Sequence, residues 1–156
     1  MTRKALKKHH SPAMSPLLRA LTYSRAAHQP VTDAMLLHCY SALDAFQRGH
    51  GSRDLFVILS RHLLIAEELC LLGLEAESLA SIQRAHGAMV LMDAAQQQSG
   101  AWTLDDAAYS LLSDAVVCLD SQLTVASLSD IAAAEARMIE GLMRTGHTQQ
   151  VAEEQI

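Results

Sequence analysis

Aromatic residues are scarce in this chain, with one Trp, three Tyr and two Phe among 156 residues. Strands of sandwiches and barrels draw on Tyr, Phe, Trp and Thr, so this composition disfavours an all-β fold. Proline and glycine are also few, at three and seven residues. Half of the residues are hydrophobic, which is enough for a core of Leu, Ala, Ile, Val and Met. Such a core favours long helices.

Cysteine is limited to Cys39, Cys70 and Cys118, and no two of them form a C-x-x-C pair. This spacing disfavours a zinc ribbon and a thioredoxin-like redox site. Each cysteine lies in apolar sequence, so we expect buried, reduced thiols and a cytoplasmic location.

A long uncharged apolar run is missing as well. No stretch of about 18 such residues occurs, which predicts that no helix spans a membrane. The Ser-Pro steps at 11–12 and 15–16 interrupt the apolar segment that a signal peptide requires after a basic start.

Negative charge is absent from residues 1–25. These residues carry a charge of +6, from Arg3, Lys4, Lys7, Lys8, Arg19 and Arg25. The rest of the chain has six basic against 17 acidic residues, a net charge of −11. A basic arm beside an acidic body predicts contact with nucleic acid or with an acidic partner surface. Tyr23 is the only nearby aromatic residue for base stacking, so a solvated or partner-docking tail is the other interpretation.

These patterns predict an all-α protein, an up-and-down bundle of five to six helices. Residues 1–12 are expected to form a disordered basic arm, 13–145 a single helical domain, and 146–156 a flexible polar tail.

Turn and capping residues divide the bundle. We expect a short helix over 16–27 that ends before Pro30, and a second helix with Thr32 as its N-cap. Ser52 is predicted to cap the third helix, which ends at Gly73. The third helix is apolar nearly all round, which is typical of a central helix in a bundle.

The later helices carry similar signals. The fourth is expected to begin at Leu74 or Glu75 and to end at Gly100, with Val90 on its inner side and with Gly87 allowing close approach of a neighbour. Thr103 with Asp106, and Ser127 with Asp130, resemble capping boxes for the fifth and sixth helices. The sixth is expected to close at 145–146.

Residues 128–133 resemble the opening of a helix-turn-helix unit. The amphipathic pattern, however, continues unbroken through Ala136, without the turn that such a unit needs. The supposed recognition helix offers only Arg137 and Arg144 as donors to bases, beside Glu135 and Glu140. We therefore expect one continuous helix.

Eight histidines raise the question of a metal site. Helical zinc and di-iron sites use Glu-x-x-His or His-Glu-x-x-His spacing, and neither occurs. His62 and His86 lie on apolar faces of two helices that we expect to pair, with Glu67 and Cys70 nearby. This is the one metal-like arrangement, and histidines bonded within or beside the core are the favoured interpretation, so we predict no cofactor.

Catalytic motifs are not found. Cys39 follows His38, and Ser60 lies close to His62, but adjacent helical residues point about 100° apart and do not form a catalytic pair. The sequence has no G-x-S-x-G and no phosphate-binding glycine loop. We predict a non-enzymatic protein.

The order of elements resembles a known group of proteins. The segments LSRHLLIAEELCLLGLE (59–75), GAWTLDDAAYSLL (100–112) and LDSQLTVASLSDI (119–131) follow a basic arm. In this the chain is similar to small helical proteins of proteobacterial phages, plasmids and genomic islands. The resemblance covers roughly residues 15–143, and it implies a bacterial, cytoplasmic, mobile-element setting without transferring any functional residue.

The sequence therefore predicts a helical interaction module that binds a protein partner or a second copy of itself. The Ala-rich fifth and sixth helices are the candidate faces of a homodimer. The alternative is a DNA-binding accessory or regulatory protein that uses residues 3–25.

Overall fold

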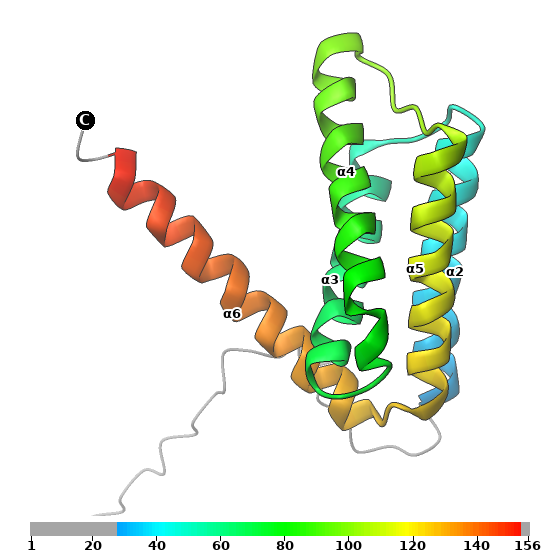
Figure 1. Ribbon diagram of the computed structural model, residues 1–156, viewed down its shortest axis with the longest axis vertical. Helices are drawn as coiled ribbons and strands as arrows, with labels where there is room; N and C mark the ends of the chain where they lie inside the picture. Colours follow the sequence, from blue (N-terminus) through cyan, green and yellow to red (C-terminus); the bar gives the residue numbers. More distant parts are fainter. Residues whose placement is uncertain (1–27, 154–156) are drawn as a thin grey trace, which may run out of the picture.

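The computed structural model describes residues 28–153, with side chains to residue 146. This part of the chain is all helical and contains no strand (Figure 1). Its elements are α2 (His28–Gln47), α3 (Arg53–Leu71), the 3-10 helix η2 (Ala76–Ser78), α4 (Leu79–Ser99), α5 (Asp106–Val125) and α6 (Leu128–Glu153). The predicted all-α bundle is confirmed. The basic arm, its six Lys and Arg residues, and the helix expected over 16–27 lie outside the described residues.

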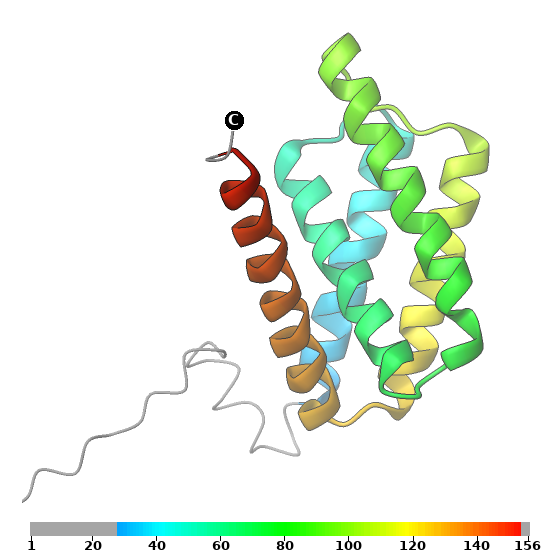
Figure 2. The same ribbon diagram turned by 60° about the vertical axis from the view of Figure 1, so that its left-hand side comes forward.

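Helices α2 to α5 form a four-helix bundle in which consecutive helices are joined by short connections (Figures 1 and 2). Helix α5 packs on both α4 and α2, which closes the ring. Helix α3 contacts each of the other four α-helices, as predicted for a helix that is apolar nearly all round. Helix α6 packs on α3 and then leaves the bundle toward its C-terminal end (Figure 1). No helix in residues 28–153 is long and apolar enough to cross a membrane.

The core lies between α2, α3, α4 and α5, with Ile131, Ala134 and Met138 of α6 packed onto it, and consists mainly of Leu, Ala and Met. Its largest fully buried apolar side chains are Phe46, Leu59, Leu63, Leu69, Ile82, Leu112, Leu119 and Leu123. At the end of the bundle where α4 ends and α5 begins, the ring of Trp102 lies 5.1 Å from that of Phe56 and 6.0 Å from that of Phe46, between centroids. Such tilted ring pairs stabilise beyond the area that they bury.

Two predicted caps are confirmed. The Ser52 hydroxyl accepts a hydrogen bond from the backbone N–H of Leu55 at 3.3 Å. At the start of α6, the Ser127 hydroxyl accepts from the N–H of Asp130 at 3.1 Å, and the Asp130 carboxylate accepts from the N–H of Ser127 at 2.9 Å. This reciprocal pair is a capping box with Asp in place of Glu.

Two other predicted caps are wrong. Thr32 lies inside α2 (His28–Gln47) and is not its N-cap, and Pro30 lies in the first turn of the described helix, where its missing N–H has no intrahelical role. Thr32 is buried inside that helix and donates its hydroxyl to the Gln29 carbonyl at 3.1 Å. Helix α5 is capped by Asp105, not Thr103, since the Asp105 carboxylate accepts from the N–H of Ala108 at 2.7 Å.

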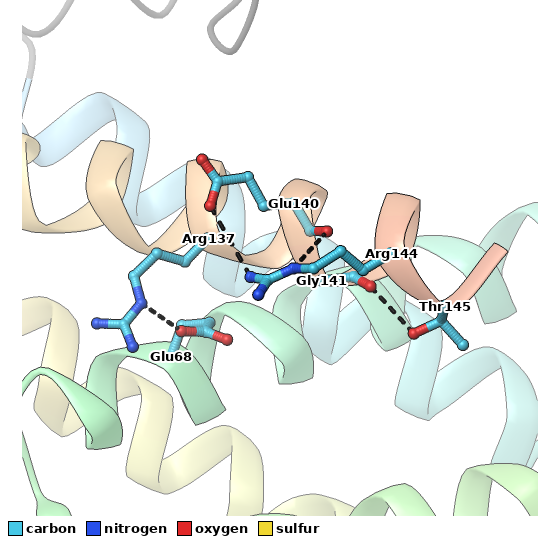
Figure 3. Close-up of polar contacts among 6 residues, drawn as sticks. All are labelled: Glu68, Arg137, Glu140, Gly141, Arg144 and Thr145. Carbon is cyan, nitrogen blue, oxygen red and sulfur yellow. Dashed lines mark hydrogen bonds and ion pairs between the residues drawn. The ribbon is translucent and has the colours of Figure 1, made fainter. Parts of the chain in front are cut away.

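Two predicted boundaries also differ. Helix α4 begins at Leu79, not at 74–75, because Glu75 takes the left-handed conformation at φ 54° and the 3-10 helix follows. Helix α6 continues through 145–146 to Glu153, since a helical glycine costs only about 1 kcal/mol. The Thr145 hydroxyl donates to the carbonyl of Gly141 at 3.0 Å, within the helix (Figure 3). From Leu128 onward α6 is one continuous helix, not a helix-turn-helix unit.

Candidate interaction surface

A groove of about 900 Å³ lies between α4 and the first half of α5. We call it the α4–α5 groove. Most of its lining is apolar, and the lining side chains are those of Arg84, Gly87, Ala88, Val90, Leu91, Met92, Ala95, Thr103, Leu104, Asp105, Ala107, Ala108 and Leu111.

The spacing of these residues explains how two helices build one groove. On α4 they include Arg84, Gly87, Leu91 and Ala95, and on α5 they follow Leu104 at i+3, i+4 and i+7. Residues three and four apart share a face of a helix. Because α4 and α5 pack against each other, the two stripes border the same space.

Large apolar side chains in this groove are open to solvent. Leu91 is 72% exposed and the adjacent Val90 is 68% exposed. The prediction that Val90 lies on the inner side of its helix is therefore wrong. The inner side is taken by Ile82, Ala85, Ala88, Met89 and Met92, which are buried.

Gly87 has a different use from the predicted one. A Cβ atom built on Gly87 meets nothing within 4 Å, so no neighbouring helix approaches it closely. Because Gly87 lines the groove, its missing side chain leaves open space there.

Charged groups mark the two ends of the groove. Arg84 lies at the end toward the start of α4, and within residues 28–146 it has no ion-pair partner. Asp105 lies at the other end, where its carboxylate also caps α5. The groove is thus basic at one end and acidic at the other.

Two ion pairs hold the first half of α6 on α3. Arg61 of α3 pairs with the buried Glu135, and Arg137 Nε lies 2.9 Å from Glu68 Oε2 (Figure 3). Farther along α6, Leu142 and Met143 are 56% and 71% exposed.

The two histidines of the metal hypothesis have separate partners. The ring of His62 is buried, its Nδ1 donates to the carbonyl of Ile58 at 2.7 Å, and its centroid lies 5.9 Å from that of His38. Burial lowers the pKa of His62. His86 Nε2 instead lies 2.9 Å from Glu67 Oε2. Within residues 28–146, no three His, Cys, Asp or Glu side chains are grouped so as to hold a metal ion.

The cysteines are free thiols. Cys39 and Cys70 are buried as predicted, whereas Cys118 is only half-buried. Burial raises the pKa of Cys39 to about 12 and that of Cys70 to about 11. Because the thiolate is the reactive form, both thiols stay protonated and unreactive near neutral pH.

Gln122 is a buried polar residue that the sequence patterns did not indicate. It is fully buried on α5, and its Nε2 faces the carbonyls of Ala66 at 3.0 Å and Leu74 at 3.1 Å and the sulfur of Cys70 at 3.2 Å. The Cys70 thiol in turn donates to the Glu75 carbonyl at 3.2 Å. This network ties α5 to the end of α3 and to the turn before α4.

Fold and surface together define a four-helix bundle with a fifth, projecting helix and an open apolar groove. No family model, curated protein or solved structure matches this chain. The resemblance to proteins of mobile elements stays a prediction.

Proposed function

We propose that the protein is a non-enzymatic helical interaction module that binds an amphipathic protein helix in the α4–α5 groove. The observation that carries this proposal is the exposure of Val90 and Leu91 side by side in a predominantly apolar groove. Contiguous exposed apolar surface of this kind is typical of interaction sites. Covering these side chains with an apolar partner face removes their area from water, which favours binding.

The lining of the groove supports a helical occupant. Small residues on both walls, Gly87 and Ala95 on α4 and Ala107 on α5, leave space for a helix to lie close. Amphipathic helices bind in such grooves through anchors at i, i+3, i+4 and i+7. The open space at Gly87 suits one large anchor side chain.

Photo-crosslinking in a bacterial host tests this proposal. A benzophenone amino acid replaces Leu91 in one protein and Val117 in a control. Val117 is also on this helix pair and is 58% exposed, but it does not line the groove. We expect protein adducts at position 91 and not at position 117, identified by mass spectrometry. Equal adducts at both positions, or none at position 91, contradict the proposal.

A second candidate function is nucleic-acid binding by residues 3–25, which is favoured by the +6 charge of residues 1–25. Lys and Arg that neutralise phosphates give affinity that falls steeply with salt. Deleting residues 1–25 should abolish binding to duplex DNA, measured by fluorescence anisotropy at two salt concentrations. Equal binding by the shortened and full chains would rule out residues 1–25 as the DNA-binding segment.

The setting is part of the same proposal. Three free thiols in residues 28–146 support a reducing compartment, the bacterial cytoplasm. Association with a mobile element rests on the sequence resemblance alone.

A further inference from the structure

Helix α6 carries exposed apolar side chains beyond the part that packs on the bundle, at Leu142 and Met143. Ile131, Ala134 and Met138 are buried on the bundle, and the same apolar stripe continues to Leu142 and Met143, which are exposed. Figure 1 shows the helix leaving the bundle over this part. The helix therefore presents the apolar side chains of Leu142 and Met143 to solvent.

This segment and the α4–α5 groove match in length. The α4 wall of the groove runs from Arg84 to Ala95, which is about 16 Å at 1.5 Å per residue. Helix α6 continues from Gly141 to Glu153, which is about 18 Å by the same measure. The backbone of this part of α6 is long enough to span the groove from end to end.

Their charges also match. The groove is basic at Arg84 and acidic at Asp105. Along α6, the exposed Glu140 precedes Arg144 by one turn, with 4.0 Å between Oε2 and the guanidinium (Figure 3). A helix lying parallel to α4 would place Glu140 toward Arg84 and direct Arg144 toward the acidic end. Complementary charges of this kind fix the register and direction of a docked helix.

The helix that fills the groove cannot come from the same copy. The first half of α6 is fixed to α3 by its buried face and by the pairs Arg61–Glu135 and Arg137–Glu68. Turning the second half into the groove of its own chain would break these contacts. A second copy can supply the same helix without any such loss.

We propose that the α4–α5 groove binds residues 140–153 of a second copy, so that two copies exchange α6 reciprocally in a twofold dimer. This inference rests on the proposed function and names its partner. Leu142 and Met143 are the anchors, and Glu140 with Arg84 is the pair that sets the register.

Sedimentation equilibrium of the full-length protein tests the dimer. We expect a dimer for the wild type and a monomer for Leu91→Glu and for Met143→Glu, with the dissociation constant raised at least about 30-fold, as for a central interface anchor. Val117→Glu is the matched control and should remain dimeric. Circular dichroism and thermal unfolding verify that each variant is folded, because all three sites are on the surface.

Charge exchange tests the register separately. Glu140→Arg alone should weaken the dimer, and adding Arg84→Glu to it should restore the dimer. A wild type that stays monomeric into the upper micromolar range, or a dimer that survives both Leu91→Glu and Met143→Glu, overturns the inference. If position 91 then forms adducts with a different protein, the proposed function is supported and only the second copy is rejected as the partner.

Discussion

Replacing Gln122 by Glu should destabilise the fold strongly at pH 7 and only slightly at pH 4. The substitution keeps the shape of the side chain but turns the donor Nε2 into an oxygen atom. That oxygen would face the carbonyls of Ala66 and Leu74, which now accept from Nε2 at 3.0 and 3.1 Å. The Cys70 sulfur also loses its donor.

The expected loss of stability follows from the need to protonate the glutamic acid at this site. A glutamic acid in the unfolded chain has a pKa of about 4.3, so binding a proton at pH 7 costs about 2.7 pKa units, or roughly 3.7 kcal/mol. The neutral acid has one donor where the amide has two, which removes a further hydrogen bond of about 1 kcal/mol. We expect a loss of about 5 kcal/mol at pH 7 and about 1 kcal/mol at pH 4.

The sign of the pH effect is defined by the raised pKa of the buried acid. In the folded Gln122→Glu variant the acid keeps its proton above about pH 4.3, whereas in the unfolded chain it releases the proton. The folding stability of the variant is therefore fully present below about pH 4.3 and is lost as the pH rises. The assay is urea unfolding followed by circular dichroism at both pH values, expressed as the difference from the wild type. Ser121→Glu, on the exposed neighbour, should stay within about 0.5 kcal/mol. A loss below about 1 kcal/mol for Gln122→Glu at pH 7 would refute the donor role of Gln122.

Further predictions concern glycines and buried titratable groups. Gly51→Ala should lower stability by about 2–3 kcal/mol in chemical unfolding, because its Cβ would collide with the ring of Phe46. Gly87→Ala should raise stability by about 1 kcal/mol, since its Cβ meets nothing within 4 Å. Burial raises the pKa of Cys39 from 9.0 to about 12, so only the unfolded thiol ionises above pH 9. Stability should fall by up to about 4 kcal/mol by pH 12, and Cys39→Ala should flatten this fall. Burial lowers the pKa of His62, so the unfolded state binds the proton at a higher pH than the folded state. The melting temperature should therefore fall from pH 7 to pH 5, and this fall should be smaller in His62→Asn.

Local capping signals predicted some helix ends well and others badly. Ser52 and the Ser127–Asp130 pair cap as predicted, and Ser is among the strongest N-cap residues. Asp105, and not Thr103, caps α5, and Asp is the stronger N-cap of the two. The choice depends on where the preceding loop is fixed, and Trp102 fixes it by packing on Phe56 and Phe46. Such a long-range contact cannot be read from local sequence.

The candidate site was less predictable than the fold. Leu104, Ala108 and Leu111 follow the spacing of an apolar helix face, but this pattern does not distinguish a face in the core from one that borders an open groove. Leu91 was missed because α4 has apolar residues on two sides, and only the inner side was assigned to packing. Gln122 had no signal at all, since its partners are backbone carbonyls of α3 and its following turn. Contacts of backbone atoms leave no residue pattern in the sequence.

The contact of α6 with the α4–α5 groove of another copy can form either a closed dimer, in which two copies exchange α6, or an open chain of copies. In a closed dimer the second contact forms within an existing pair, so it involves no new loss of translational and rotational freedom. In an open chain each contact adds another copy, and the mass grows with concentration. A Leu91→Glu copy keeps an intact α6 but lacks a working groove. In an open chain, the variant copy would bind at one end through its α6 and stop further growth. In a closed dimer, a heterodimer of variant and wild type would keep only one of the two groove contacts. Because closure makes the two contacts cooperative, the heterodimer with one contact is weak. An equal mixture of Leu91→Glu and wild type should therefore contain wild-type dimers beside variant monomers. Shortened oligomers in this mixture would instead indicate an open chain.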